Sequence, residues 1–491
     1  MAATTERSSD APAIAELHET FEAQKAAFLK DPYPTAEERK RRCQAVADVL
    51  VANRQRVRDA MSQDFAVHPE LFTDMVEVLG MVSRAQWAID HLEAWMSPDE
   101  REIDPAMYGT GRAFVQYQPK GVVGNIVPWN FPFDLGMGPL IDALAAGNRF
   151  IIKPSEYTPA CSQLMKELVN EAFDRDLVDV AVGGLDLAKE FTSLRWDHLL
   201  YTGNPTIGRE VAKAAAANLV PVTLELGGKC PALVNPDAVN RKTVANIIGT
   251  KMIKNGQMCI SVDYCLVPRE QLDEFVDLAK EYVAETTPDY SASDNCPGII
   301  SERHFKRLEA LLGEAKDSGA QVVQLDQEGA LNPATRQMPL SLVVDPGEDL
   351  GIMRDEIFGP ILPIRPYDSV DEAIDFINAG ERPLGLYVMT MDQAMADETL
   401  RRTSSGGFSV NACAMQGAIA ALGFGGVGQS GIGRHHGIDG FREFSNPRGV
   451  FVRGEDDLID AFYAPYGERQ QGLVDAVLGG GEDAPKPEMT G

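Results

Sequence analysis

Apolar positions recur at helical spacing near the start of the chain. In residues 13–29 and 36–64 they return every three or four residues, as at Val46 and Leu50, and this period predicts two amphipathic helices. The intervening D-P-Y-P-T at 31–35 is typical of a turn. We expect both helices to pack on a sheet formed by later segments.

From about residue 112 the apolar runs shorten to strand length and alternate with helical stretches. A first series comprises V-V-G-N-I-V at 122–127, R-F-I-I-K at 149–153, V-D-V-A-V at 178–182 and H-L-L-Y-T at 198–202. A second series comprises C-P-A-L-V at 230–234, Y-C-L-V at 264–267, Q-V-V-Q-L at 321–325 and I-L-P-I-R at 361–365. Strands that alternate with helices are typical of parallel sheets built from βαβ units. The predicted fold class is therefore α/β with two domains, which meet near E-L-G-G-K at 225–229.

Two strand-like segments lie outside both series, namely R-A-F-V-Q-Y-Q at 112–118 and G-V-F-V at 449–452. They predict a third, smaller sheet. An intramolecular hairpin and pairing with a second subunit both fit these segments, and composition does not separate the two.

Length and composition indicate a soluble protein of more than one domain. The chain has 491 residues, of which 44% are hydrophobic and 24% charged, and a single core seldom organises so long a chain. The formal net charge of −28 repels phosphate backbones and anionic lipids, so we expect neither nucleic-acid nor membrane binding. The seven cysteines include no C-x-x-C pair, which fits a reducing compartment better than a disulfide framework.

The terminal sequences predict neither a signal peptide nor a membrane anchor. The N-terminal M-A-A-T-T-E-R-S-S-D has no apolar run of the kind that signal peptides carry, so we expect a cytoplasmic protein. The uncharged stretch 403–433 contains many glycines and polar residues such as Asn411 and Gln416, so we expect a loop-rich interior segment there and no membrane span. Residues 466–491 predict a polar tail, with disorder in its last part, G-G-G-E-D-A-P-K-P-E-M-T-G.

One cysteine and one glutamate stand in sequences that suggest covalent chemistry. Cys259 lies in N-G-Q-M-C-I-S-V-D-Y, and Glu225 opens E-L-G-G-K upstream of it. A thiolate converts a planar carbonyl into a tetrahedral adduct from which hydride can leave. The common fate of a cysteine is instead that of a small, inert core residue, and we expect that for Cys161, Cys265 and Cys296.

Five further blocks follow one another along the chain: P-W-N-F-P at 128–132, K-P-S-E at 153–156, Y-T-G-N-P-T-I-G at 201–208, E-I-F-G-P at 356–360 and G-F-G-G-V-G-Q-S-G at 423–431. With the segments around Cys259 and Glu225 they resemble the aldehyde dehydrogenase superfamily, and the similarity extends from about residue 14 to 465. Three phrases are similar to the branch that contains coniferyl and class 3 aldehyde dehydrogenases: N-L-V-P-V-T-L-E-L-G-G-K at 218–229, D-Y-C-L-V-P at 263–268 and A-P-Y-G at 464–467.

The resemblance implies two Rossmann-like parallel-sheet domains, one for the cofactor and one for catalysis, together with a small oligomerisation sheet and a homodimer. The expected boundaries are 1–12 for a disordered tail, 13–111 with 119–225 for the NAD(P)-binding domain, 226–432 for the catalytic domain, 112–118 with 433–465 for the oligomerisation and C-terminal segment, and 466–491 for the polar tail.

The resemblance also implies three catalytic roles. Cys259 is the expected nucleophile, and Asn130 with the backbone N–H of Cys259 is expected to stabilise the oxyanion. Glu225, flanked by two leucines, is the expected base that activates water for release of a thioester. Read from the residues alone, Asn130 could instead complete a turn between two prolines, and Glu225 could form a structural ion pair with Lys229.

NAD is the expected cofactor, and NADP stays open because relatives with the same K-P-S-E use both. Pro205 suits the first position of a helix whose N-terminus attracts pyrophosphate. The carboxylate of Glu156 is expected to hold the adenosine ribose and to hinder a 2′-phosphate. Glu356 is expected at the nicotinamide ribose; its alternative is a plain surface glutamate. The expected cofactor-binding residues are Trp129, Lys153, Ser155, Glu156, Gly203, Asn204, Gly208, Leu226, Glu356 and Phe358.

Departures from the family pattern concentrate around the expected substrate site. Met258 stands where threonine is common, and the residues after Asn411, A-C-A-M-Q-G-A-I-A-A-L-G, carry no charge. A mouth without charge favours apolar ligands, so we expect oxidation of an aromatic or otherwise apolar aldehyde. The alternatives are a CoA-acylating relative and a non-enzymatic binding or structural protein. Glu225, as a base for water, disfavours the first, and the presence of Cys259 disfavours the second. His435 and His436 lie in a glycine-rich turn without ligand spacing, so we expect no metal site.

Overall fold

The chain forms two units, each with its own sheet structure. The computed structural model describes residues 10–326 and 329–478. The first unit comprises Met1–Trp95 with Pro119–Ser445, and the second comprises Met96–Gln118 with Asn446–Gly491. The disordered tail expected over 1–12 is wrong for residues 10–12, because α1 begins at Ala11; its remainder, residues 1–9, and the expected disorder of 479–491 lie outside the described residues.

A six-stranded sheet in the first unit has the order β15-β7-β6-β3-β4-β5. Five of its strands are parallel, and β15 is antiparallel to β7, with Gly431 opposite Glu225. The chain adds β4 and β5 on one side of β3 and then β6 and β7 on the other, so the order reverses between β3 and β6. The strands are β3 (Val122–Ile126), β4 (Arg149–Lys153), β5 (Val178–Val180), β6 (His198–Gly203), β7 (Val222–Leu226) and β15 (Gly431–Ile432).

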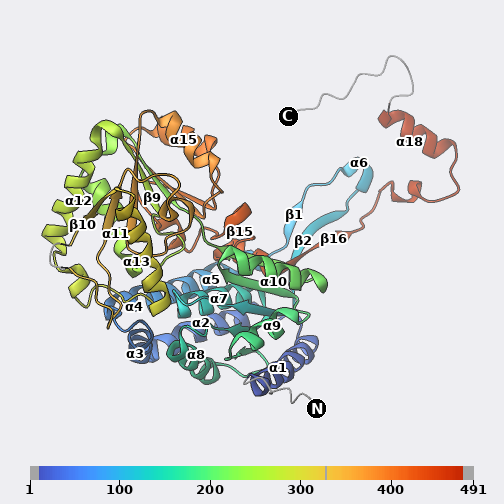
Figure 1. Ribbon diagram of the computed structural model, residues 1–491. Coiled ribbons are helices and arrows are strands. Elements are labelled where there is room, and N and C mark those ends of the chain that lie inside the picture. The colour runs from blue at the N-terminus through green and yellow to red at the C-terminus, as the bar shows by residue number, and fades with distance from the viewer. Residues whose placement is uncertain (1–9, 327–328, 479–491) are drawn as a thin grey trace, which may run out of the picture. The chain divides into compact units, whose positions relative to one another are not determined.

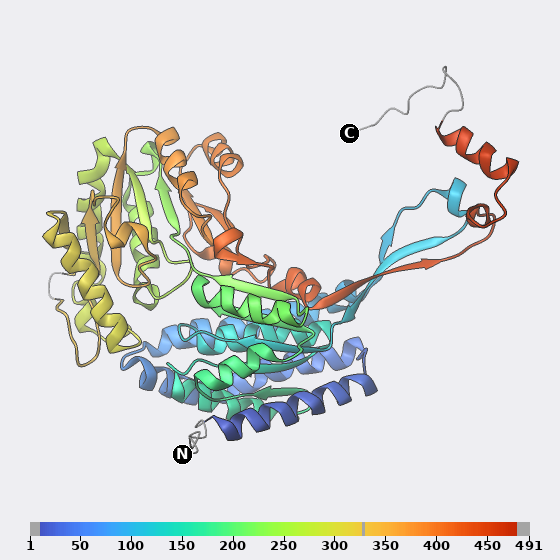
Figure 2. The same cartoon turned by 45° about the vertical axis from the view of Figure 1, so that its right-hand side comes forward.

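A seven-stranded sheet in the same unit has the order β10-β11-β12-β9-β8-β13-β14, and only its edge strand β10 is antiparallel to its neighbour. Figure 2 shows this sheet, among yellow and orange helices, above the six-stranded one. The strands are β8 (Pro231–Val234), β9 (Tyr264–Pro268), β10 (Gln321–Gln324), β11 (Ser341–Val344), β12 (Ile361–Tyr367), β13 (Gly385–Met389) and β14 (Gly407–Val410). The two predicted strand series therefore form the two predicted parallel sheets.

Helices cover both faces of the six-stranded sheet (Figure 1). One face carries α1 (Ala11–Lys30), α9 (Leu185–Ser193) and α10 (Pro205–Ala217), and their apolar sides meet β3, β6 and β7 in a core that includes Leu17, Phe191 and Trp196. The other face carries α7 (Pro132–Ala146) and α8 (Pro159–Ala172). The helices of the second sheet are α11 (Arg241–Met252), α12 (Leu272–Thr286), α13 (Glu302–Asp317), α14 (Gly351–Arg354), α15 (Val370–Ala379) and α16 (Gln393–Arg402).

The long helix predicted over 36–64 is two helices, α2 (Ala36–Ala52) and α3 (Arg54–Phe65). The prediction was wrong at Asn53, whose backbone leaves the helical conformation and whose side chain Nδ2 donates to the Val49 carbonyl at 2.9 Å. The expected packing was also different, because α2 lies on α7 and α8 and not directly on a sheet. Short and bent elements follow before the strands, namely α4 (Glu70–Thr73), a π-helical turn (Asp74–Leu79) and α5 (Gly80–Met96).

The second unit contains a three-stranded sheet of order β1-β2-β16, in which β1 and β2 are antiparallel. Its elements are β1 (Asp99–Arg101), α6 (Pro105–Tyr108), β2 (Arg112–Pro119), β16 (Ser445–Val452) and α18 (Glu468–Leu478). The division differs from the expected boundaries: the expected cofactor and catalytic domains fall in one unit, and the segment from 466 onward belongs to the second unit. Residues 96–111 belong to this unit, and residues 433–445 belong to the first, because α17 (Gly437–Glu443) packs on α7. Within the predicted polar tail, α18 is a helix without a buried residue.

Candidate active site

Several predicted cofactor-binding residues and the predicted catalytic Asn130 gather at one edge of the six-stranded sheet. Trp129 and Asn130 follow β3, Lys153 ends β4, Gly203 ends β6 and Leu226 ends β7. These strands are parallel, so their carboxyl ends lie at the same edge. Ligands of open α/β sheets bind at this edge where the strand order reverses, and here the reversal lies between β3 and β6. The topology therefore places a ligand site beside these residues.

Cys259 lies on a tight loop between α11 and β9. Lys254, Asn255 and Gly256 take positive φ angles of 55°, 53° and 75°. A β-carbon on Gly256 would lie 2.2 Å from the Gly359 carbonyl oxygen, so only glycine allows the E-I-F-G-P block to lie against this loop. Cys259 is half-buried, whereas the other six cysteines are buried, as predicted for three of them.

The surroundings of Cys259 favour the neutral thiol. Burial raises the pKa of Cys259 well above its usual value, and the nearby Glu356, Cys230 and Glu225 raise it further. Formation of the nucleophilic thiolate therefore requires transfer of its proton to a base.

Glu225 is 2% exposed on β7, and neither of its carboxylate oxygens has a hydrogen-bond partner among the described residues. Burial raises its pKa well above the usual value; Arg434 opposes this shift, and Glu443 adds to it. The alternative ion pair with Lys229 is wrong, because the Lys229 ammonium pairs with Asp263 and donates to the Ile352 carbonyl at 2.7 Å. Glu225 is thus a buried carboxyl group free to exchange a proton.

Glu356 is a second carboxyl group near the thiol. A β-carbon on Gly227 would lie 2.1 Å from its Oε2, so the glycine after Leu226 makes room for it. Burial raises the pKa of Glu356 to about 8, Asp263 contributes to the increase, and the backbone N–H of Gly228 opposes it. The alternative of a plain surface glutamate is wrong, since Glu356 is half-buried beside E-L-G-G-K.

Asn130 is 3% exposed, and its Nδ2 donates to the Gln257 carbonyl at 3.2 Å. Gln257 is itself fixed, because its Oε1 accepts from Ile300 N at 3.0 Å and its Nε2 donates to the Gly298 carbonyl at 3.1 Å. The Asn130 amide therefore reaches the loop that carries Cys259, far along the chain, and does more than complete a local turn.

Aromatic rings from two of the predicted blocks, from Tyr157 and from α13 lie against one another. The Trp129 and Phe358 centroids are 5.3 Å apart in an edge-to-face arrangement, which brings together two residues predicted from different blocks. His304 of α13 lies 5.4 Å from Trp129 and 6.1 Å from Tyr157. Sequence reasoning missed both: Tyr157 directly follows K-P-S-E and could have been noticed, whereas His304 carries no local signal.

The remaining predicted residues fit a dinucleotide. Asn204 caps α10, accepting from Ile207 N at 3.0 Å, and Pro205 opens the helix as predicted. A β-carbon on Gly208 would lie 2.7 Å from the Leu226 side chain, so the glycine lets α10 lie close to β7. Buried Lys153 pairs with the 56% exposed Glu156 at 3.2 Å. Ser155 is buried beside this pair, and its Oγ accepts from Tyr157 N at 3.2 Å. A capped helix N-terminus and a lysine–glutamate pair on one sheet edge suit pyrophosphate and ribose hydroxyls.

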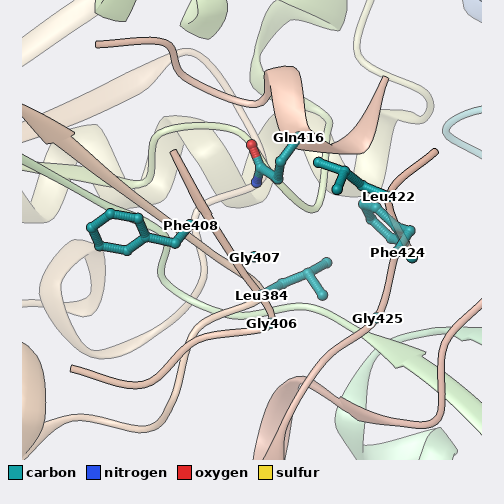
Figure 3. Close-up of a pocket in the computed structure, with 9 residues that line it drawn as sticks. Leu384, Gly406, Gly407, Phe408, Gln416, Leu422, Phe424 and Gly425 are labelled. Carbon is teal, nitrogen blue, oxygen red and sulfur yellow. The ribbon is translucent and has the colours of Figure 1, made fainter. Parts of the chain in front are cut away.

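A cavity of about 250 Å³ is lined by nine residues between positions 384 and 425, and Cys259, Glu225 and Asn130 are not among them. Ile260, the residue after Cys259, lies close to Gly417, which is next to the lining residue Gln416: a β-carbon on Gly417 would lie 2.7 Å from Ile260 Cδ1. The Ile260 carbonyl accepts from the Tyr387 hydroxyl at 2.6 Å. Figure 3 shows apolar side chains around the space and one amide, that of Gln416, whose oxygen accepts from Ser409. The lining residues are Leu384, Gly406, Gly407, Phe408, Gln416, Leu422, Gly423, Phe424 and Gly425. Part of the uncharged segment after Asn411 therefore lines the cavity.

The described residues contain neither a metal cluster nor a membrane-spanning helix. Over residues 10–326 and 329–478, no three His, Cys, Asp or Glu side chains are placed to hold a metal ion. Within the same ranges, no helix has the length and apolar character needed to cross a membrane.

The chain is similar to aldehyde dehydrogenases in sequence and in fold. Residues 7–450 match the model described as "Aldehyde dehydrogenase family". Over 474 residues the chain is 40% identical to a "Probable coniferyl aldehyde dehydrogenase" from Caulobacter vibrioides and 37% identical to a "Coniferyl aldehyde dehydrogenase" from Pseudomonas sp., covering 95% of this chain and 98% of each relative. The substrate-bound AldH of Staphylococcus aureus superposes with a TM-score of 0.86 at 30% identity over 94% of this chain and 99% of that chain. A Mycobacterium tuberculosis aldehyde dehydrogenase complexed with NAD⁺ superposes with a TM-score of 0.79 at 26% identity over 90% of each chain.

Proposed function

Because the chain belongs to the aldehyde dehydrogenase family, we propose that it oxidises aromatic or otherwise apolar aldehydes to carboxylic acids, with NAD as the preferred cofactor. The observation that carries the proposal is the meeting of three groups around one loop. Cys259 supplies a half-buried thiol, Asn130 reaches its loop, and Glu225 lies buried nearby without a hydrogen-bond partner. A separate observation, the largely apolar cavity lined in part by the uncharged segment after Asn411, bears on the substrate class.

The first half of the reaction attaches the aldehyde to the enzyme. A neighbouring carboxylate, Glu225 or Glu356, takes the thiol proton, since both influence the pKa of Cys259. The thiolate attacks the carbonyl carbon and forms a thiohemiacetal. The Asn130 amide and the Cys259 backbone N–H donate to the resulting oxyanion.

The second half releases the acid. When bound, NAD would accept the hydride. The residues that would hold it are Lys153, Glu156, Glu356 and Phe358, together with the N-terminus of α10. Loss of hydride leaves a thioester on Cys259. Glu225, as a carboxylate, takes a proton from a water molecule that attacks this thioester; the C–S bond breaks and the thiolate returns. A buried base for water favours hydrolysis over transfer of the acyl group to CoA.

We infer the substrate class from the cavity and from the similarity to coniferyl aldehyde dehydrogenases. Leu422 and Ala421 are both exposed, Leu422 by 47%, but only Leu422 lines the cavity. We expect Leu422→Asp to lower kcat/KM for coniferyl aldehyde by about five- to thirtyfold, because roughly 1 to 2 kcal/mol of apolar contact is lost and a charge is introduced. Acetaldehyde, which is too short to fill the cavity, should be affected less.

Ala421→Asp is the matched control, since it adds the same charge one residue away from the lining. NADH formation with a panel of aldehydes measures both variants and the unmodified enzyme. Equal kcat/KM of the unmodified enzyme for acetaldehyde and coniferyl aldehyde would contradict the apolar preference.

The preference for NAD rests on Glu156, whose exposed carboxylate would repel a 2′-phosphate. We expect Glu156→Ala to lower the KM for NADP about tenfold and to raise the KM for NAD, because the repulsion and a ribose hydrogen bond are both removed. Initial rates with each cofactor measure the change. A lower KM for NADP than for NAD in the unmodified enzyme would overturn this assignment.

A homodimer is the proposed assembly, and the small sheet supports it. β16 is an edge strand of the three-stranded sheet, and most of its residues are exposed; such an edge can pair with another chain. Sedimentation velocity tests the proposal, and a monomer at micromolar concentration would refute it. The cytoplasm is the proposed location, which fractionation of cells that produce the protein would test.

A further inference from the structure

A lysine and a glutamate are buried together behind the site, and the proposed reaction does not use them. The Lys254 ammonium lies 3.9 Å from Glu77 Oε1, and both side chains are at most 1% exposed. Burying two charges is unfavourable unless they are paired and hydrogen-bonded. The other contacts of Lys254 and Glu77 therefore matter for why this buried pair exists.

Lys254 holds the loop that carries Cys259. It begins the run of three residues with positive φ that leads to Cys259, and its carbonyl accepts from Gln257 N at 3.1 Å and from Gln257 Nε2 at 3.0 Å. Its ammonium lies 2.7 Å from His68 Nε2 and 4.1 Å from the centroid of the Phe65 ring. The side chain thus ties the base of the loop to the N-terminal helices.

Glu77 holds the segment that carries Asn130. It lies in the π-helical turn Asp74–Leu79, a distortion often found at functional sites. Its Oε2 accepts from Phe133 N at 3.1 Å and from Asp134 N at 2.8 Å. These are the first-turn amides of α7, which starts two residues after Asn130, and a carboxylate there is favourable because it meets the positive end of the helix dipole.

The contacts close into a circuit: Glu77 to the first turn of α7, then along the chain to Asn130, across to the Gln257 carbonyl, and through Lys254 back to Glu77. We propose that Glu77 and Lys254 are positioning residues that fix the Asn130 amide relative to the Cys259 thiol. The inference rests on the proposed function and deepens it, because it states what sets the geometry of the oxyanion site.

The test uses Lys254→Met, Glu77→Gln and the double variant in the full-length protein. Single-turnover NADH formation, with enzyme in excess over coniferyl aldehyde, reports attack and hydride loss together. We expect all three variants to be slower by about ten- to hundredfold, since a displaced donor loses much of its effect on the transition state. Aldehyde KM and NAD binding, followed by protein fluorescence, should change less than threefold or so.

Comparison of Tm with the single-turnover rate distinguishes a displaced Asn130 amide from a general loss of stability. Each single variant leaves one buried charge without its partner and should lower Tm, whereas the double variant leaves none and should recover most of that loss. Its single-turnover rate should nevertheless remain low. A double variant with the single-turnover rate of the unmodified enzyme would overturn the proposal.

Arg39→Met is the matched control at the other end of α7. Arg39 is also a buried cation, and it donates to the Ala145 and Ala146 carbonyls at 3.1 and 2.8 Å. We expect a lower Tm but a single-turnover rate within about twofold of the unmodified enzyme. A loss of rate equal to that of Lys254→Met would show a general packing effect and refute the positioning role. Absence of single-turnover NADH in the unmodified enzyme would instead refute the proposed function.

Discussion

Replacement of Cys259 by serine is expected to abolish aldehyde oxidation, with steady-state turnover at least about a thousandfold lower. The substitution changes only the attacking atom, and a serine hydroxyl ionises far less readily than a thiol. The side chain contributes no predicted contact to the cofactor, so NAD binding measured by fluorescence should be retained. NADH formation at saturating aldehyde gives the turnover.

Cys230→Ser is the control for this variant. The Cys230 thiol is buried and lies 3.4 Å from the Cys259 carbonyl oxygen, so it is the neighbouring sulfur without a proposed role in the chemistry. It should keep most of the activity. A Cys259→Ser enzyme that turns over at a near-normal rate would exclude the thiol as nucleophile.

Glu225→Gln is expected to divide the reaction into its two halves. Attack and hydride loss still occur once, because Glu356 remains to take the thiol proton, and they give a burst of NADH close to the enzyme concentration. Turnover then falls by about a hundredfold or more because no base activates water. Stopped-flow absorbance records the burst. Mass spectrometry of the quenched protein should find an acyl group on Cys259.

The pH profile distinguishes Glu225 from Glu356. Burial raises the pKa of both carboxyl groups, that of Glu356 to about 8. Only the carboxylate accepts a proton, so thioester hydrolysis in the unmodified enzyme should be slow in acid and rise with pH above the range in which an ordinary glutamate ionises. This rise should disappear in Glu225→Gln and persist in Glu356→Gln. The opposite pattern would make Glu356 the base.

The sequence predicted those parts of the molecule that local patterns specify. Periodicity located α1 and the eight strands of the two series. Short blocks predicted Cys259, Glu225 and Asn130 as catalytic residues, and those roles stay predictions. The capped start of α10 was likewise predictable, since Pro205 acts locally.

Features that depend on tertiary contacts could not be read in this way. The raised pKa of Cys259 arises from burial, from Glu356 on the loop before β12 and from Glu225 on β7, and the Glu77–Lys254 pair joins residues far apart in the chain. The break at Asn53 depends on a side-chain hydrogen bond within an otherwise helical pattern, and the helix α18 lies in a segment whose composition suggested only a polar tail.

The pairing of β15 with β7 has a consequence for biosynthesis. Gly431 lies opposite Glu225, so the strand that carries this glutamate gains its outer neighbour from a segment near the end of the chain. While the ribosome has not yet released that segment, β7 is an edge strand with unpaired backbone groups. The nascent protein therefore completes the surroundings of Glu225 late, after both parallel sheets have been translated, and a chain terminated before Gly431 contains every proposed catalytic residue but lacks the strand that closes this side of the site.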